Sequence, residues 1–526
     1  MGNTTRATAT AWLSAFAAVV AIVASGCSAG QQAGADEVGF GDGASPGTTA
    51  GHGVVRIGHV GELVSDPLAV AATDSASVML VDALTDGLTS VDDDGSVVPA
   101  VASSWDSADG ATWRFTIDPT RTWSDGTPIS AQDARATLER ALGLRSERLA
   151  GARLADLVGD ASGDAAISVE DDDTVVVTLA SPNYELPAVL AGVAYGIVPA
   201  AVISDEPADG LDLLDGVVAN SGPFAGTRIV GESPVVRLEA RDGDSDAVRQ
   251  VEFVEFGSAE EAWTAYEAGD VDLVEADAGE ADADEADADG SVGGDRAEVE
   301  AVGATVVAAL GSNGVLADPA VRAGVAAALS AGGVAGSLWE SLLVGIDVSS
   351  LTPAGDTAVM GALAGVPLEV HIGPGSATRA VGDRVVSVLT EAGVAVRRVD
   401  HTVSSMGESL AGGADVIVFA VPGLQASGGL ALTALVGTGG AENVAGFSAA
   451  VVDELLAAAR SSAETSQRRQ SYSAALRAAV DAGALVPLGT IGDVWTVSSR
   501  LSFGVGGVDE RLAATPFDLA GIRVER

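Results

Sequence analysis

The sequence has 526 residues, with 27 basic and 74 acidic side chains and a formal net charge of -47. Every basic residue is Arg, which excludes a Walker-type phosphate loop, a pyridoxal Schiff base and a Lys general base. The single Cys, Cys27, excludes disulfides, four-thiolate zinc sites and iron-sulfur clusters within the chain. The acidity argues against nucleic acid and anionic lipid surfaces as partners, because both bind clustered positive charge.

Residues 1–26 are predicted to be a lipoprotein signal peptide. Arg6 precedes an apolar stretch from Ala11 to Ala24, which is shorter than the roughly 20 residues that span a bilayer. Cys27 follows this stretch directly, behind two small residues, and the arrangement resembles a bacterial lipobox. The resemblance implies cleavage before Cys27 and lipid attachment to its thiol. The alternative is an ordinary secretory signal with a chance Cys near its end.

Residues 27–53 are predicted to be a flexible tether. They are mostly Gly, Ala, Ser, Thr and Gln, without the apolar periodicity that would let them bury surface. A tether behind a lipid anchor would hold a folded body on the extracytoplasmic face of the cell membrane.

From residue 54 onward, the pattern alternates between strands and helices. Strands are predicted at 54–60, 88–91, 112–117, 175–179, 251–256, 368–372, 394–399 and 415–421. Helices are predicted at 77–84, from Ser130 to about Leu142, and at 259–268, 377–392 and 447–460. The segment from Leu368 to Val399 forms a β-α-β pattern, and the uninterrupted apolar strand at 415–421 is typical of a buried parallel sheet.

Residues 86–142 carry a resemblance to a known family. They read DGLTSVDDDGSVVPAVASSWDSADGATWRFTIDPTRTWSDGTPISAQDARATLERAL. This order is similar to the signature region of the family 5 extracellular solute-binding proteins, the oligopeptide, dipeptide and nickel receptors of ABC importers. Further matches are Ile197-Val198-Pro199, the segment Asn220 to Phe224, and the helix that follows Asp318.

The resemblance implies an α/β, two-lobed periplasmic-binding-protein-like fold of type II, the large peptide-receptor class, with hinge-linked lobes. Lobe I is expected at residues 54–249, with residues 484–526 returning to it, and lobe II at residues 250–483. The chain is expected to cross between the lobes near Arg249 and Ala484.

The resemblance also implies a function. The expected protein is a monomeric substrate-binding lipoprotein that captures a short peptide between two lobes and delivers it to a separate ABC permease and ATPase. No catalysis, cofactor, metal or nucleic acid is expected. Two alternatives stay open: a receptor for nickel, haem or an oligosaccharide, and a non-transport envelope or signalling lipoprotein. A secreted hydrolase is the weakest reading, because no Gly-x-Ser-x-Gly motif occurs.

Residues 275–290 contain an acidic run in which Asp and Glu alternate with Ala. Clustered carboxylates suit hard divalent cations, but the run lacks the Gly turn and terminal Glu of a calcium loop. We interpret it as a solvated insertion within lobe II.

Three residues are candidate ligand contacts by their position. Tyr195 precedes the Ile-Val-Pro element, Asn220 lies beside the expected lobe crossing, and Trp123 lies in a turn. A packed aromatic is the alternative for Tyr195 and Trp123, and a turn residue for Asn220. Three other tryptophans occupy strand or helix positions and are predicted to be core residues: Trp105, Trp113 and Trp263.

The usual acidic contact for a peptide amine is absent. Many family 5 peptide receptors place an Asp beyond the late strand, whereas residues 422–429 here contain no acid. A nickel or haem ligand would instead favour His401 or Arg379. His59 and His371 lie in strand-like runs and are predicted to be sheet residues with satisfied hydrogen bonds.

Overall fold

The structure analysed is a computed structural model. It describes residues 53–70, 74–92, 96–144, 149–159, 163–205, 210–215, 218–230, 234–241, 248–276, 296–312, 314–331, 351, 355–363, 365–401, 414–422, 427–440, 442–503 and 519–524. Three predictions lie outside these ranges: the signal peptide, lipid attachment at Cys27, and the tether except for Gly53. The acidic insertion lies outside them from residue 277 onward.

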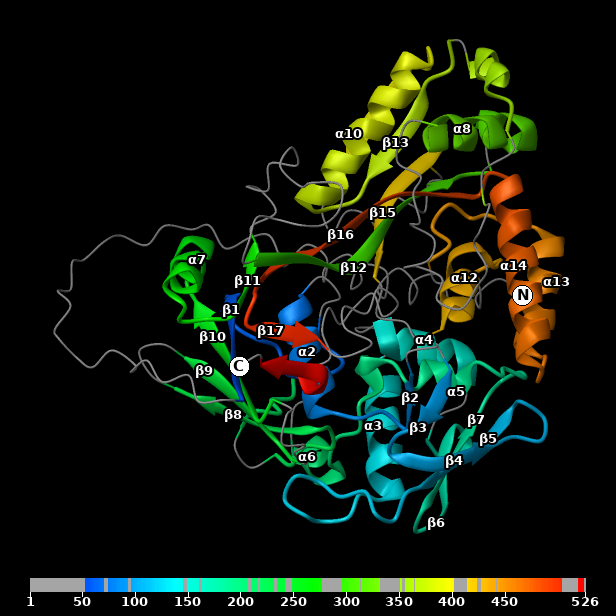
Figure 1. The fold of residues 1–526 in the computed structure, drawn as a ribbon. Coiled ribbons are helices and arrows are strands. Elements are labelled where there is room, and N and C mark those ends of the chain that lie inside the picture. The colour runs from blue at the N-terminus through cyan, green and yellow to red at the C-terminus, as the bar shows by residue number, and fades with distance from the viewer. Residues whose placement is uncertain are drawn as a thin grey trace.

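Among the described residues, ten strands form one continuous sheet that runs through both lobes (Figure 1). Their order is β14-β13-β15-β12-β16-β11-β1-β10-β9-β8. The bounds are β1 (Val54–Val60), β8 (Phe224–Ile229), β9 (Val235–Ala240), β10 (Gln250–Phe256), β11 (Leu273–Ala276), β12 (Arg296–Leu310), β13 (Leu368–Ile372), β14 (Val396–Asp400), β15 (Val416–Pro422) and β16 (Leu485–Ser498).

Lobe I contains the β8 end of this sheet, and its core joins both ends of the chain. Ile57 of β1, Phe253 of β10 and Trp495 of β16 are fully buried together with side chains of helix α2. The surrounding elements are α2 (Ser75–Leu84), α6 (Ala200–Asp205), α7 (Ala259–Ala268) and the short strands β17 (Leu501–Phe503) and β18 (Ile522–Val524).

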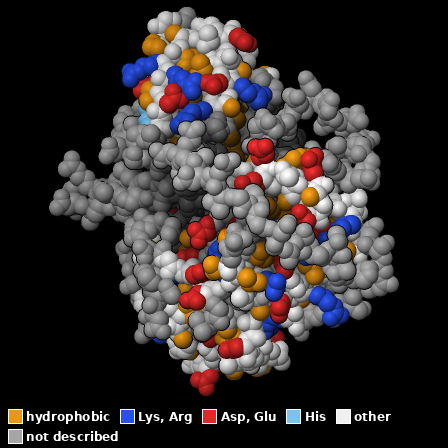
Figure 2. Space-filling view, turned by 90° about the vertical axis from the view of Figure 1, so that its left-hand side faces the viewer, with side chains coloured by type: hydrophobic (Ala, Val, Ile, Leu, Met, Phe, Trp, Pro, Cys, Tyr) orange, Lys and Arg blue, Asp and Glu red, His pale blue; other side chains and the backbone are white. Residues whose placement is uncertain are grey.

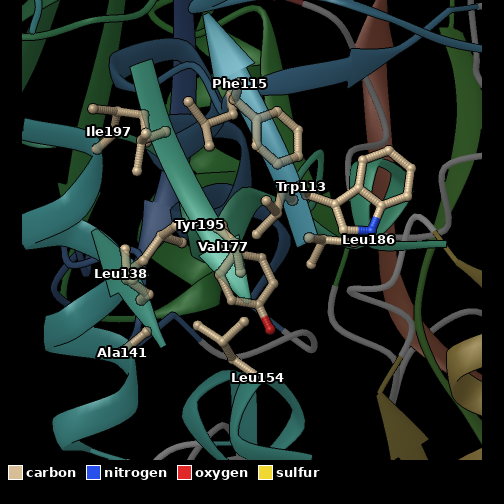
Figure 3. Close-up of a cluster of buried hydrophobic side chains, with 14 of the residues drawn as sticks. Trp113, Phe115, Leu138, Ala141, Leu154, Val177, Leu186, Tyr195 and Ile197 are labelled. Atoms are coloured by element: carbon tan, nitrogen blue, oxygen red, sulfur yellow. The ribbon is translucent and has the colours of Figure 1, made fainter. Parts of the chain in front are cut away.

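A small antiparallel sheet forms a subdomain beside lobe I, in the order β4-β5-β7-β6. Trp113 and Phe115 of β5 point into its core together with Leu138 of α3 (Figure 3). The elements are β2 (Thr89–Val91), β3 (Val97–Pro99), β4 (Ala102–Asp106), β5 (Thr112–Ile117), β6 (Ile167–Asp171), β7 (Thr174–Thr178), α3 (Ala131–Gly143), α4 (Leu149–Val158) and α5 (Leu186–Val189).

Lobe II has three layers, with helices on both faces of the sheet. Ile417 and Phe419 of β15 pack beneath one group of helices, whereas Val416 and Val418 pack beneath the other. Both faces of β15 are therefore apolar, as its uninterrupted apolar sequence predicts. The first group is α12 (Gly428–Val436), α13 (Ala450–Arg460) and α14 (Thr465–Asp481), and the second is α8 (Pro319–Ala331) and α10 (Ser376–Glu391).

The structure confirms the main predicted elements. The strands predicted at 54–60 and 112–117 are β1 and β5, and the predicted β-α-β segment is β13, α10 and β14. At the start of α3, Ser130 and Asp133 form a reciprocal capping box, in which the Ser130 N–H donates to the Asp133 carboxylate over 2.9 Å. Each of these features depends on local sequence, so it can be predicted without knowledge of its distant partners in the fold.

β12 and β16 are the long strands that cross between the lobes. They pair antiparallel from Arg296↔Ser498 to Ala309↔Leu485, with register shifts at Val302/Ala304 and Val306/Val307. The crossing expected near Ala484 lies immediately before β16. The boundary expected near Arg249 instead separates β9 from β10, which are hydrogen-bonded neighbours in lobe I. Because β10 also pairs with β1 along its whole length, we propose that lobe II begins in β12.

The strand directions bring two edges of the sheet toward each other. In lobe II, β15 runs from Val416, opposite Leu310, to Pro422, opposite Ala304, and β13 and β14 run parallel to it. In lobe I, β11 pairs antiparallel with β16, from Leu273 opposite Val497 to Ala276 opposite Val494, so β11 runs toward lobe II. Strands β1 and β10 are parallel to β11. The carboxyl ends of the parallel strands in each lobe therefore point toward the other lobe.

Candidate functional site

The candidate functional site lies between these two facing carboxyl edges. Open α/β sheets bind ligands outside the carboxyl ends of their parallel strands, where turns and helix N-termini present polar groups. On the lobe I edge, β1 ends before Gly61 and the exposed Glu62, and β10 leads into α7 through its N-cap, Ser258. On the lobe II edge, β13 leads into α10 through Gly375, and β14 ends before His401.

The lobe I edge is rich in carboxylates that are held in place by partners. Glu255, at the end of β10, accepts hydrogen bonds from the Arg228 guanidinium over 2.7 Å and from the Leu63 N–H over 3.2 Å. His59 of β1 is 6% exposed, and its Nδ1 lies 3.4 Å from Oε1 of Glu275. His59 is thus a buried sheet residue, as predicted. The edge as a whole favours a cationic group on a ligand.

The lobe II edge contains a buried pair of histidines. Nδ1 of His371 lies 2.8 Å from Nε2 of His401, and Nε2 of His371 lies 3.1 Å from Oε1 of Glu369. Burial lowers the pKa of His401, and the neighbouring His371 lowers it further. Neutral rings satisfy this chain of contacts, with the His401 Nε2–H donating to His371 and the His371 Nε2–H donating to Glu369. His371 is therefore a satisfied sheet residue, and His401 is its partner.

A second contact region joins the lobes through buried charged groups, here called the interlobe clamp: Arg153, Glu185, Glu442 and Arg468. Arg153 of α4 forms an ion pair with Glu442, and their side chains are 6% and 2% exposed. Nε of Arg468 donates to Glu185 over 2.7 Å. In Figure 1, the clamp lies where α12 and α14 approach α4 and α5.

Hydrogen bonds reinforce the clamp. The Ser427 hydroxyl, at the start of α12, donates to Glu185 over 2.9 Å, and the Tyr184 N–H donates to the Arg460 carbonyl over 2.8 Å. The clamp is incompletely satisfied, because Nε of Arg153 and Oε2 of Glu442 are buried without hydrogen-bond partners among the described residues.

Asp156 lies one turn beyond Arg153 on α4 and belongs to the same environment. Its side chain retains contact with solvent, yet protein atoms surround it closely enough that desolvation raises its pKa to about 7. The Glu442 carboxylate raises this pKa further, and Arg153 opposes the shift.

The structure brings two of the three predicted ligand residues together. The Ser124 N–H donates to the Asn220 carbonyl over 2.9 Å, and the Arg241 guanidinium donates to the carbonyl of Trp123 over 2.9 Å and to that of Asn220 over 3.4 Å. Trp123 and Asn220 are 4% and 2% exposed. Both therefore hold a turn together from inside the protein.

Tyr195 lies in the core of the subdomain (Figure 3), in the same buried cluster as Trp123. It is 5% exposed, and its hydroxyl donates to the Ala150 carbonyl over 2.9 Å. Burial raises its pKa well above the ordinary range. The placements favour the packed-aromatic alternative for Tyr195 and Trp123 and the turn-residue alternative for Asn220, and the role of all three in ligand binding stays a prediction. Trp113 is a core residue as predicted, and Trp105 and Trp263 are partly buried against hydrophobic clusters.

The described surface shows mixed charge and no further candidate binding site. On the face drawn in Figure 2, acidic and basic side chains lie next to one another on the upper lobe, which is lobe II. Arg397, Arg398 and their carboxylate partners account for ion pairs at that end of the sheet. Within the described ranges, no cluster of three metal-ligating side chains occurs, and no helix is long and apolar enough to cross a bilayer.

Comparison with known proteins places this geometry in context. Residues 96–335 match the model of bacterial extracellular solute-binding proteins, family 5 Middle. The chain is 28% identical over 221 residues to the probable deoxycholate-binding periplasmic protein YgiS of Escherichia coli, which covers 40% of the chain and 41% of YgiS. It is 26% identical over 211 residues to the periplasmic murein peptide-binding protein MppA of Escherichia coli, covering 38% and 39%. The aligned segments thus span about two fifths of these relatives.

Solved structures extend the likeness over most of the chain. The unliganded open form of the murein tripeptide-binding protein MppA superimposes with a TM-score of 0.71 at 20% identity, covering 90% of this chain and 98% of that one. At this identity the superposition shows the fold.

The two lobes, the crossing strands and the facing edges define a two-lobed, periplasmic-binding-protein-like fold. Residues 96–335, a little under half of the chain, resemble the bacterial extracellular solute-binding proteins, family 5.

Proposed function

We propose that this protein is the extracytoplasmic receptor of an ABC importer, and that it captures a short peptide between its lobes for delivery to a separate permease and ATPase. The observation that carries the proposal is the pair of facing carboxyl edges joined by β12 and β16. A ligand that contacts both edges at once binds the closed arrangement more tightly than the open one, so it shifts the population toward closure. The partner supplies the energy for import.

The polarity of the site supports a peptide. The lobe I edge carries Glu62, Glu255 and Glu275, which suit an amine even though residues 422–429 lack an acid. The murein peptide-binding relative supports the same ligand class by its name. Extended backbone in the ligand would add hydrogen bonds that do not depend on side-chain identity.

Purified protein is expected to melt at a higher temperature in the presence of a tripeptide pool. A ligand bound only to the folded state at 100 times its dissociation constant adds about 2.7 kcal/mol to the free energy of unfolding. Differential scanning fluorimetry measures the shift, and native mass spectrometry of freshly purified protein gives the mass of any co-purified ligand. An unchanged melting temperature with peptides, but a rise with nickel, haem or an oligosaccharide, would redirect the assignment. No rise with any of them would favour an envelope scaffold.

The proposal includes membrane anchoring through a lipid on Cys27. Cys27→Ser is expected to move the protein from the membrane fraction to the medium or the extracytoplasmic space, because the substituted residue cannot form the thioether. Fractionation and immunoblotting measure the distribution, with Ser28→Ala as a matched neighbouring control. Retention of the Cys27→Ser variant in the membrane fraction contradicts the anchor.

A further inference from the structure

The first turn of α10 lies on the lobe II edge that faces lobe I, and nothing in the helix itself caps it. The backbone turns through Gly373, Pro374 and Gly375 between β13 and the helix. Gly375 has φ +99° and ψ 144°, a conformation closed to other residues, and no side chain caps the helix. No acidic residue occupies the first turn of this 16-residue helix. Its N–H groups and positive dipole end are therefore poised for an external acceptor.

A buried hydroxyl provides an independent observation at the same place. Thr378 is 0% exposed, and its Oγ1 has no hydrogen-bond partner among the described residues. A Cβ built on Gly375 would lie 3.6 Å from this oxygen, so the hydroxyl lies directly beneath the turn that begins the helix. Buried hydroxyl groups are nearly always hydrogen-bonded. An acceptor from beyond the described residues is needed to satisfy it, and a ligand oxygen or a water can supply one.

A cation completes the arrangement. Arg379 is exposed: its backbone N–H donates to the Gly375 carbonyl over 3.1 Å, but its guanidinium forms no ion pair within the described ranges. The nearby Asp400 is already engaged by the Arg398 guanidinium over 2.8 Å, and this contact lowers the pKa of Asp400, with a smaller contribution from Arg379. Arg398 in turn pairs with Asp383. The guanidinium of Arg379 is thus available on this turn to pair with an anionic group of a ligand.

We propose that the first turn of α10, with Thr378 and Arg379, binds the carboxylate of the captured solute. The inference rests on the proposed function and specifies which lobe holds the anionic end of the ligand. The donors are the first-turn N–H groups, the Thr378 hydroxyl and the Arg379 guanidinium. A zwitterionic ligand would then lie with its carboxylate toward lobe II and its amine toward the carboxylates of the lobe I edge.

The test places a carboxylate on the helix turn itself. Ala377→Asp, at an exposed position of the first turn, is expected to weaken binding of a tripeptide free-acid pool by about tenfold or more, because the new carboxylate repels the ligand and competes for the same N–H groups. The unliganded variant should be at least as stable as the wild type, since an acid at this end favours the helix. Ser387→Asp adds the same charge at an exposed position about 15 Å further along α10 and serves as the control.

A second variant tests the hydroxyl. Thr378→Val has nearly the same shape and removes an unpaired buried polar group, so the unliganded protein should not lose stability. If the hydroxyl binds the ligand, isothermal titration calorimetry will show weaker binding of the free-acid pool. Unchanged affinity would mean that the Thr378 hydroxyl does not bind the ligand, and Thr378 would no longer be part of the proposed site.

A tripeptide amide pool separates the two hypotheses. Equal binding of free acids and amides, in both the wild type and Ala377→Asp, overturns the carboxylate site but leaves peptide capture intact. If neither pool binds the wild type, peptide capture fails. Titration of acetate and inorganic phosphate then tests the α10 turn on its own: binding that Ala377→Asp abolishes supports the anion site, and no binding of either ion overturns it.

Discussion

Replacing Glu442 by Leu is expected to lower the free energy of unfolding by about 3–5 kcal/mol, because it leaves the Arg153 guanidinium buried between two lobes without its ion-pair partner. Arg153→Met should cost a similar amount, since it leaves the Glu442 carboxylate unpaired. The double variant, Arg153→Met with Glu442→Leu, should recover most of the loss. Nε of Arg153 and Oε2 of Glu442 already lack partners among the described residues, so the pair is incompletely compensated for its desolvation.

Urea unfolding of the four proteins, followed by Trp fluorescence and circular dichroism, gives the complete double-mutant cycle. The matched control is Glu170→Gln, which breaks the Arg114–Glu170 pair, whose side chains are 43% and 53% exposed. That variant should change stability by less than about 1 kcal/mol. Equal effects of Glu442→Leu and Glu170→Gln would contradict the buried clamp. Additive single effects in the double variant would show that Arg153 and Glu442 are not paired.

Trp495→Ala is expected to cost a similar 3–5 kcal/mol for a different reason. The indole is fully buried in the lobe I core, and its Nε1–H donates to the Ser75 hydroxyl over 2.9 Å. Truncation removes this packing, leaves a cavity and removes one hydrogen bond to the Ser75 hydroxyl. Melting temperature and urea unfolding measure the loss.

Two further variants define the cause of that loss. Trp495→Phe keeps most of the volume but removes the hydrogen bond, so its loss should be clearly smaller. Trp263→Ala truncates an indole that is only partly buried, against a small separate cluster, and should cost less than Trp495→Ala. Equal losses for both truncations would show that Trp495 does not hold the lobe I core together.

The parts of the fold that sequence reasoning predicts are those whose causes are local. Alternation of Trp113, Phe115 and Ile117 predicts β5, and Ser130 with Asp133 predicts the start of α3. The boundary expected at Arg249 depended instead on the partner of β10. That partner is β1, about 200 positions earlier in the chain, and no periodicity within β10 reveals it.

The candidate site was less accessible to prediction for the same reason. Arg153 and Glu442 are separated by 289 positions, and nothing near either residue marks them as partners. The positions of Tyr195 and Trp123 in the chain make them candidate ligand contacts, but aromatic side chains occur in cores and in ligand sites alike. Only the fold shows that these two are inside. The Gly375 turn, Thr378 and Arg379 are visible in the sequence. Only the structure shows that β13 runs toward lobe I and so places this turn on the edge that faces lobe I.

The late position of β16 in the chain also sets the order in which the molecule can fold. Trp495 reaches Ser75 across 420 positions, and β11 and β12 both need β16 as their neighbour in the sheet. Contacts at such separations form slowly, because a long chain must close before they contribute. Lobe I therefore stays incomplete until nearly all of the chain is available. For the extracytoplasmic protein proposed above, this delay is expected to keep the chain unfolded long enough for export. A product truncated before residue 485 would expose open sheet edges to proteases.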